Sequence, residues 1–175
     1  MSQRIPDRFD PWRYADLGKA LSGVIRLEEL PRLASCLRDT GGEARFDLQF
    51  ERDAERRAVV TGSVVAELVL ECQRCLEAVS LPVETHLALA FVEGIDQAGR
   101  LPEALDPCLV EEGRVAFRDL IEDELLLLLP QVAMHEDGAC PTDLTVGGED
   151  EPVETDDGQR SNPFAVLADL KRDKE

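Results

Sequence analysis

The sequence has few aromatic side chains, few histidines and no long apolar segment. Aromatic residues make up 5% of the 175 residues, and there are two histidines. The apolar runs, among them residues 125–129, are far shorter than the roughly 20 residues that a transmembrane helix needs. Residues 1–14 carry charges throughout and lack the apolar centre of a secretory signal. We therefore expect neither a membrane protein nor a secreted one, and a core built mainly on Leu and Val.

Sequence signatures of enzymes are also absent. The chain contains no G-x-S-x-G motif, no glycine-rich phosphate loop and no H-E-x-x-H motif. Two histidines without a matched nucleophile do not favour a hydrolytic triad. No pair of carboxylates can be assigned as an acid and a base from the sequence. The sequence therefore predicts a protein without catalytic activity.

Basic residues are scarce relative to acidic ones, and the imbalance is uneven along the chain. The 19 Lys and Arg residues face 37 Asp and Glu residues, which gives a net charge of -18. Residues 1–60 hold 11 of each sign, so the whole excess lies in residues 61–175, with 8 basic and 26 acidic side chains. Because nucleic-acid affinity comes largely from clustered Lys and Arg, this balance favours a basic protein partner over RNA. The alternative is that the charge only keeps the protein soluble.

Alternating patterns predict three consecutive β-strands. Residues 43–51 alternate strictly between apolar and polar or charged side chains, as a half-buried strand does. Residues 58–71 and 81–91 alternate in the same way, with Gly62 as a candidate bulge or bend. Short polar connections between the three segments favour an antiparallel meander.

The clearest helix signal begins at Asp119. This residue is a candidate N-cap, and Glu122 lies three positions later, as in a capping box. Pro130 would end the helix. Its apolar stripe consists of Leu120, Ile121, Leu125 and Leu128. The predicted fold class is therefore α+β, with an antiparallel β-sheet packed against a Leu-rich helix.

The character of the chain changes after residue 140. Residues 143–157 contain seven acidic side chains and no Lys or Arg, so we expect residues 141–161 to be a disordered acidic linker. Asn162-Pro163 places a helix N-cap before Pro and predicts a short tail helix over residues 162–175. Residues 1–140 are then expected to form a single α+β domain.

Four side chains have the types and spacing of a metal-ligand set. Cys72 and Cys75 form a C-x2-C pair at a turn between two predicted strands, and His135 and Cys140 follow the predicted helix. Thiolates and imidazole are the usual ligands of structural zinc. We predict that these four residues bind Zn2+ and tie the strand turn to the end of the helix. The alternative is a set of inert side chains.

A second alternative for the C-x2-C pair is thiol–disulfide exchange. Such chemistry needs a thiolate activated by a helix N-terminus or by cationic neighbours. Arg74 is a cationic neighbour, but a strand rather than a helix is expected to follow. Of the other cysteines, Cys36 is expected in the core, and Cys108 is expected to be either structural or a bystander.

Four blocks of the chain match one known family in their order. Asp10-Pro11 followed by Gly23 forms the opening, and VTGSV (residues 60–64) runs on to LECQRCL (residues 70–76). DLIEDELLLLLP (residues 119–130) precedes His135 and Cys140, and NPFAVLADLK (residues 162–171) ends the match. With these motifs the chain resembles the YceD family, the large ribosomal RNA subunit accumulation proteins.

The resemblance implies a cytoplasmic bacterial protein with a role in the synthesis, processing or stability of 23S ribosomal RNA. It implies no catalytic activity, and it does not by itself imply that a metal is bound. Combined with the charge, it favours a non-enzymatic ribosome-biogenesis factor that meets a basic ribosomal protein or a large-subunit assembly factor. Contact with 23S ribosomal RNA is then indirect or weak, and its best candidates are Arg4, Arg8, Arg13 and Lys19.

Two other functions remain open from the sequence. One is a zinc-stabilised protein-interaction adaptor that is not linked to ribosomes, and the other is the C-x2-C redox protein. Association with precursors of the large ribosomal subunit would distinguish a ribosome-biogenesis factor from such an adaptor. Retention of function in a protein without Cys72 and Cys75 would exclude the second.

Overall fold

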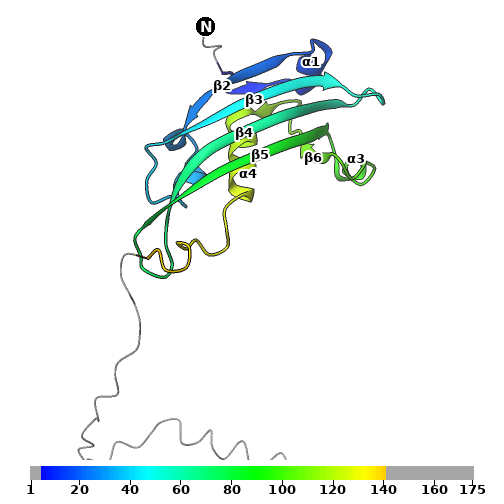
Figure 1. The fold of residues 1–175 in the computed structure, drawn as a ribbon. Helices are drawn as coiled ribbons and strands as arrows, with labels where there is room; N and C mark the ends of the chain where they lie inside the picture. The colour runs from blue at the N-terminus through cyan, green and yellow to red at the C-terminus, as the bar shows by residue number, and fades with distance from the viewer. Residues whose placement is uncertain (1–4, 141–175) are drawn as a thin grey trace, which may run out of the picture. The chain divides into compact units, whose positions relative to one another are not determined.

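The computed structural model describes residues 5–140 of the chain. Within them lies one five-stranded β-sheet with the strand order β2-β3-β4-β5-β6. Its strands are β2 (Ala20–Arg26), β3 (Glu43–Arg52), β4 (Ala58–Glu71), β5 (Ala78–Val92) and β6 (Asp106–Leu109). The first four strands pair antiparallel in sequence order, and β6 adds to β5 in parallel (Figure 1). The expected acidic linker (residues 141–161) and tail helix (residues 162–175) lie outside the described residues.

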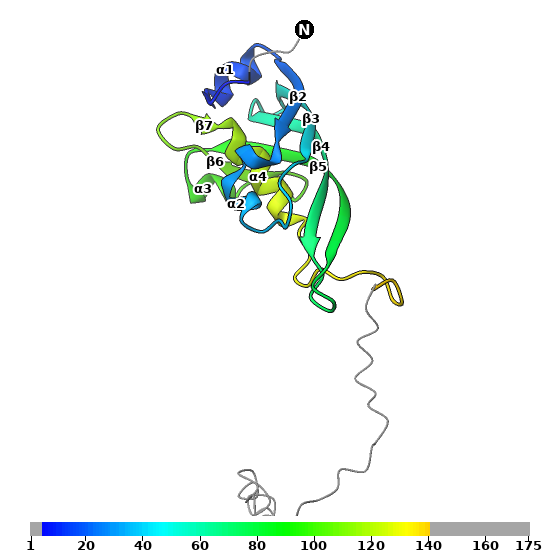
Figure 2. The same cartoon turned by 90° about the vertical axis from the view of Figure 1, so that its left-hand side faces the viewer.

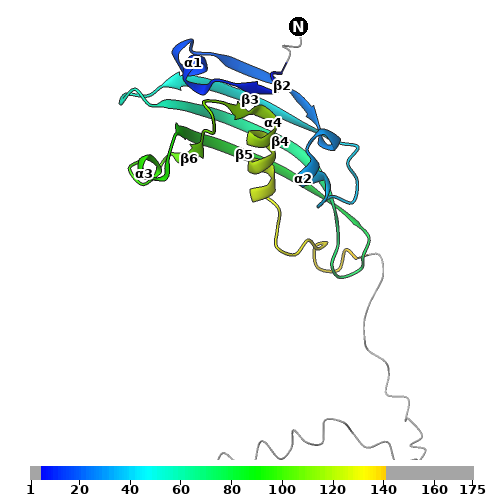
Figure 3. The same ribbon diagram turned by 180° about the vertical axis from the view of Figure 1, so that it is seen from behind.

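Short helices and one longer helix cover a single face of this sheet. They are α1 (Pro11–Asp16), the 3-10 helix η1 (Leu27–Glu29), α2 (Pro31–Ala34), α3 (Ile95–Ala98) and α4 (Phe117–Leu127). Seen along the sheet, α1, α2 and α4 lie on the same side of it (Figure 2), and in the view from behind α4 lies in front of the central strands (Figure 3). A two-stranded pair, β1 (Arg8–Phe9) with β7 (Val115–Ala116), joins the start of the chain to the start of α4. The α+β prediction is confirmed, and the sheet is mostly antiparallel.

The alternating pattern of β3 explains how the sheet has one buried and one exposed face. Ala44, Phe46, Leu48 and Phe50 are buried, whereas Glu43, Arg45, Asp47 and Glu51 between them are exposed. At Gly62 the two strands β3 and β4 approach too closely for a side chain, because an added Cβ would lie 2.0 Å from the Asp47 carbonyl oxygen. This close backbone approach accounts for glycine in a long strand.

Six aromatic rings of the described residues form one connected cluster in the core. Phe9 lies within 6.1 Å, centroid to centroid, of the rings of Tyr14, Phe50, Phe91 and Phe117. Phe46 in turn packs edge-on against Phe117. The rest of the core is aliphatic, as the composition predicts. The aromatic rings thus fasten β1 and the start of α4 to the middle of the sheet.

The start of α4 and the role of Glu122 differ from the prediction. The helix begins at Phe117 after Ala116, which provides no side-chain cap, so Asp119 lies inside the helix and the predicted capping box is wrong. Glu122 is 1% exposed and points to α2 instead. Its carboxylate accepts hydrogen bonds from Arg32 N (2.7 Å), Leu33 N (3.0 Å) and Arg32 Nε (2.8 Å). It therefore supplies the N-terminal acceptor that Leu30, the N-cap of α2, lacks.

Among the described residues, no helix is both long and apolar enough to cross a membrane.

We expect Glu122→Ala to lower the free energy of unfolding by about 2–4 kcal/mol, because two backbone N–H groups and Arg32 lose a buried acceptor. Asp119→Ala, at an exposed helical position, is expected to change it by no more than about 0.5 kcal/mol. Urea denaturation of both variants beside the wild type gives the comparison. A loss at Asp119 as large as that at Glu122 would mean that Asp119 is the helix cap after all.

Candidate metal centre

The first half of the centre is the turn between β4 and β5. Cys72 N donates to the carbonyl oxygen of Glu77 (2.9 Å), and Leu76 N donates to that of Cys72 (2.8 Å). Leu76 adopts the left-handed conformation, with φ of 63°, which folds the chain back sharply after Cys75. The turn therefore holds the Cys72 and Cys75 side chains on the same side of the hairpin end.

The second half is the segment after α4, which returns to this turn. Gln73 N donates to the carbonyl oxygen of Ala133 (2.8 Å), so the two segments are joined through their backbones. The His135 Nε2 atom lies 3.1 Å from the carbonyl oxygen of Ala78 on β5. Because a carbonyl only accepts, this contact places the proton on Nε2 and leaves Nδ1 free to bind a metal.

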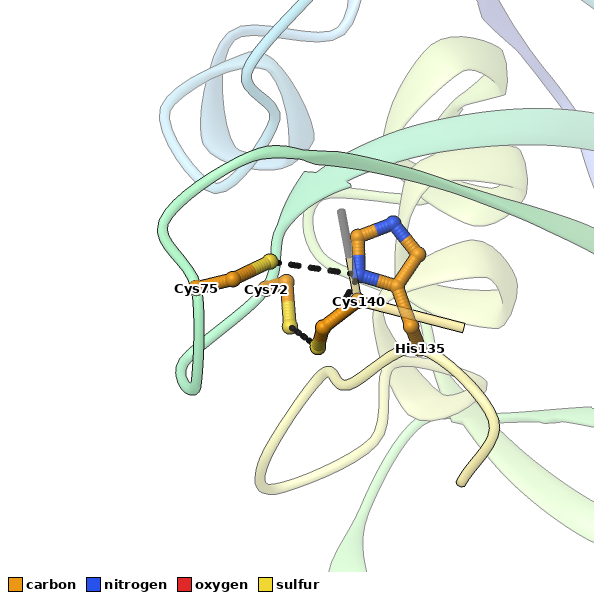
Figure 4. Close-up of side chains that lie close together, drawn as sticks. All are labelled: Cys72, Cys75, His135 and Cys140. Carbon is orange, nitrogen blue, oxygen red and sulfur yellow. Dashed lines mark hydrogen bonds between the residues drawn. The ribbon is translucent and has the colours of Figure 1, made fainter. Parts of the chain in front are cut away.

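These two segments bring all four predicted ligands together (Figure 4). Their ligand atoms, the three sulfurs and a ring nitrogen of His135, all lie within 4.8 Å of one another. The Cys72 and Cys140 sulfurs are 3.9 Å apart, and His135 Nδ1 lies 3.4 Å from Cys75 Sγ and 3.8 Å from Cys140 Sγ. Cys72, Cys75, His135 and Cys140 are therefore close enough to hold a metal ion.

The distances also agree with the geometry of a tetrahedral ion. Metal–sulfur bonds of about 2.3 Å and a metal–nitrogen bond of about 2.0 Å separate two sulfurs by about 3.8 Å and a sulfur from a nitrogen by about 3.5 Å. The three separations given above lie close to these values. The donor set, three thiols and one imidazole, is that of a closed structural site without a position for substrate.

The surroundings of the thiols favour negative charge at Cys72. Burial alone would raise the pKa of the Cys72 thiol, but hydrogen bonds from the backbone of Cys75, His135 and Arg74 outweigh burial and lower this pKa to about 5. The pKa of Cys75 is raised, by burial first and then by the neighbouring Cys72 and Cys140. Crowded thiols of this kind cannot all ionise without a cation among them, and ligand thiols must be ionised to bind metal.

Arg74 binds the segment that follows α4 through several hydrogen bonds. Its Nε donates to Cys140 Sγ (2.9 Å), and its Nη2 donates to the carbonyl oxygens of His135 (3.2 Å) and Glu136 (3.1 Å). The contact with Cys140 raises the pKa of the guanidinium. The sequence indicates Arg74 only as an activator of a redox thiol. Its place inside a C-x2-C pair gives no sign that it holds a segment more than 60 residues away.

The remaining cysteines and the other histidine lie elsewhere. Cys36 is exposed, so the prediction that it belongs to the core is wrong, and its thiol contacts the carbonyl oxygen of Arg32. Cys108 lies on β6, where burial raises the pKa of its thiol to about 11. His86 is exposed on β5, 3.6 Å from Glu84. None of the three adjoins the four-ligand cluster.

The comparisons with known proteins agree with one another. The family model "Large ribosomal RNA subunit accumulation protein YceD" matches residues 60–171, a range that includes all four clustered ligands. The chain is also similar to the large ribosomal RNA subunit accumulation protein YceD of Haemophilus influenzae, with 33% identity over 175 residues and 97% of each chain covered. No solved structure gives a significant match. This chain, with its sheet and its Cys3His cluster, belongs to the YceD family.

Proposed function

We propose that this protein acts in the accumulation of the large ribosomal RNA, through the synthesis, processing or stability of 23S ribosomal RNA. The observation that carries the proposal is the similarity to a protein of that name along 97% of both chains. A match of this extent covers the sheet, α4 and the cluster together rather than one motif. The proposed role is that of a non-enzymatic assembly factor in the cytoplasm, where ribosomes are assembled.

The metal that we propose for the cluster is Zn2+, in a structural role. Three thiolates and one imidazole are a common zinc donor set, and four protein ligands leave no position for a catalytic water. The ion would join the β4–β5 turn to the segment that follows α4, two regions 60 residues or more apart in sequence. Closing such a loop removes conformational freedom from the unfolded chain and so stabilises the fold.

The partner that we propose is a basic ribosomal protein or a basic assembly factor of the large subunit. The exposed face of the sheet supports this choice, because carboxylates outnumber bases on it. Its exposed acidic residues include Glu43, Asp47, Glu51, Glu67 and Glu84. We call these five residues the acidic face. A negative face of this kind attracts a basic surface over several ångströms and speeds its encounter.

Contact with 23S ribosomal RNA is proposed to be indirect or weak. Of the N-terminal bases expected to make such contact, Arg8 and Arg13 are exposed, whereas the Lys19 ammonium lies 4.5 Å from the centroid of the Tyr14 ring. Arg4 lies outside the described residues. The exposed bases are too few to outweigh a net charge of -18 over an extended RNA contact.

A zinc-stabilised adaptor that is not linked to ribosomes is the alternative function. It uses the same cluster and the same acidic face, so the discriminating observation is whether the protein is found with large-subunit precursor particles. A thiol-redox role is less well supported, because Cys72 is buried and the two segments surround its sulfur.

The purified protein is expected to contain one Zn2+ per chain and to lose it on Cys72→Ser or Cys140→Ser. Substitution by Co2+ should give the absorption bands of a tetrahedral thiolate site. Removal of the metal is expected to lower the free energy of unfolding by about 4 kcal/mol. This value is for comparison with protein kept in free Zn2+ at about 1,000 times the Kd of the site. Cys36→Ser, at an exposed cysteine outside the cluster, serves as the control and should keep the metal. A full metal content in Cys72→Ser would contradict the assignment.

Depletion of the protein in its host is expected to lower the ratio of 23S to 16S ribosomal RNA. The reason is that loss of a large-subunit factor affects the large ribosomal RNA selectively. The ratio is measured together with the ends of 23S precursors, and restored expression of the wild-type chain is the control. An unchanged ratio with a normal subunit profile would contradict the proposed function and favour the adaptor.

Reversal of charge on the acidic face is expected to weaken association with large-subunit precursors by about tenfold, and more steeply at low salt. The variant is Glu67→Lys with Glu84→Lys, two exposed residues on neighbouring strands. Co-sedimentation with precursor particles measures the effect. The matched control is Glu103→Lys with Glu111→Lys, which changes the net charge equally outside the sheet face. Equal loss in both variants would mean that only net charge matters.

A further inference from the structure

A pocket of about 370 Å³ lies at the opposite end of β4 and β5 from the metal centre. It is formed where α1, the turn between β3 and β4, and the segment after α3 meet, and these three elements share one end of the sheet in Figures 1 and 3. The residues that matter for its chemistry are Trp12, Arg52, Arg56, Arg57, Phe91 and Arg100. Neither the family description nor the metal cluster involves this pocket.

The pocket is basic, in a chain that is strongly acidic. Four arginines line it, and Glu55 is the only acidic residue among its lining residues. Arg52 binds Asp16 through Nε (2.8 Å), and Arg57 binds Asp53 (2.6 Å) and Glu55 (2.7 Å). Among the described residues, Arg56 and Arg100 form no ion pair. Two guanidinium groups are therefore fixed in the wall, and two remain available for an anion.

The β3–β4 turn presents Arg56 in a fixed position. Arg56 has a φ of 63°, which is uncommon for a residue other than glycine. Its N–H donates to the carbonyl oxygen of Asp53 (2.9 Å), and its own carbonyl oxygen accepts from Arg52 Nη1 (3.0 Å). The Asp53 carboxylate accepts from the backbone of Glu55 and Arg57. These hydrogen bonds fix the turn and use only the backbone of Arg56, so its side chain takes no part in them.

The aromatic part of the pocket is Trp12. Asp10 caps α1 by accepting from Arg13 N (3.0 Å), and Pro11 begins the helix, so Trp12 is set at its first turn. Its ring is half-buried against the core and lines the pocket with its remaining surface. Indole is the largest aromatic platform among the side chains, and nucleobases of any sequence stack on such rings.

Free guanidinium groups beside an indole match the two parts of a nucleotide. Guanidinium binds phosphate with two parallel hydrogen bonds, and the indole ring takes the base. We propose that this pocket binds one phosphorylated nucleotide, with its base against Trp12 and its phosphate between Arg56 and Arg100. Pockets of a few hundred cubic ångströms accept a single nucleotide and exclude a duplex.

Two sources can supply such a ligand, a free nucleotide or one unit of single-stranded RNA. RNA as the source of the ligand rests on the proposed function. Recognition of a base by Trp12 and of a phosphate by the arginines is independent of that function. A single-nucleotide contact is consistent with weak RNA binding, because the acidic face repels the rest of an RNA chain.

The test uses the fluorescence of Trp12, the only tryptophan of the chain. Adenosine 5′-monophosphate is titrated into the full-length, metal-loaded protein, with adenosine as the matched ligand without phosphate. Saturable quenching by the monophosphate, with at least about tenfold weaker binding of adenosine, is expected because the phosphate contributes charge-assisted hydrogen bonds. Absence of saturable quenching by either the monophosphate or a short single-stranded oligoadenylate would overturn the proposal, as would equal binding of adenosine.

A pair of variants shows whether the phosphate lies where we place it. Arg56→Gln with Arg100→Gln is expected to weaken monophosphate binding by about tenfold or more. Arg45→Gln with Arg114→Gln removes the same charge from exposed positions outside the pocket and should stay within about twofold. Equal weakening in both variants would contradict the site. Since all four side chains are exposed, circular dichroism should show folded protein throughout.

The oligoadenylate identifies the source of the ligand. Binding at least about tenfold tighter than the monophosphate supports RNA, and equal binding supports a free nucleotide. The ratio of 23S to 16S ribosomal RNA after depletion of the protein separates this inference from the proposed function. If the monophosphate and the oligoadenylate both fail to bind while depletion still lowers the ratio, the pocket assignment falls and the proposed function stands. If the nucleotide binds while depletion leaves the ratio unchanged, the pocket assignment stands and the proposed function falls.

Discussion

The buried carboxylate of Glu122 is the contact on which the arrangement of α4 depends. It is 1% exposed and joins α4 to the N-terminus of α2 across about 90 positions of sequence. A carboxylate inside a protein is costly unless its charge is matched, and here two backbone N–H groups and Arg32 match it. Because these donors are fixed in direction, the contact defines the rotation of α4 on the sheet. With α4 placed, Leu120, Ile121 and Leu125 face the core.

The position of α4 in turn decides where the second half of the metal centre lies. His135 and Cys140 follow the helix within a segment that has no regular secondary structure of its own. Only a few hydrogen bonds hold this segment, among them Gln73 N to Ala133 and those from Arg74. A metal ion would add four strong bonds in a region that the hydrophobic core does not reach. The helix therefore brings the ligands near, and the ion would fix them.

The sequence was most informative where a single local pattern determines the structure. The period-two alternation of residues 43–51 is a property of consecutive residues, and it identified β3 within one position. The C-x2-C pair and the His135 to Cys140 spacing likewise identified a cluster that the structure assembles. The prediction from local sequence was wrong at Glu122. A Glu three positions after an Asp looks the same in the sequence whether it completes a capping box or accepts hydrogen bonds from a distant helix. Local sequence also could not reveal the basic pocket, because Trp12, Arg56 and Arg100 meet only through the topology of the sheet.

The pocket and the metal centre lie at opposite ends of the same two strands. With 14 residues at about 3.3 Å each, β4 separates them by about 45 Å, well beyond the screening length of charge in the cell. Direct electrostatic coupling between a bound ion and a bound phosphate is therefore negligible, and perturbations at the two ends should add independently. The acidic face is the exposed side of the sheet, whereas the pocket is lined by Trp12 of α1 and by Ala58 and Phe91, which are buried on the side that the helices cover (Figure 2). A basic partner on the acidic face therefore leaves the pocket open to its own ligand.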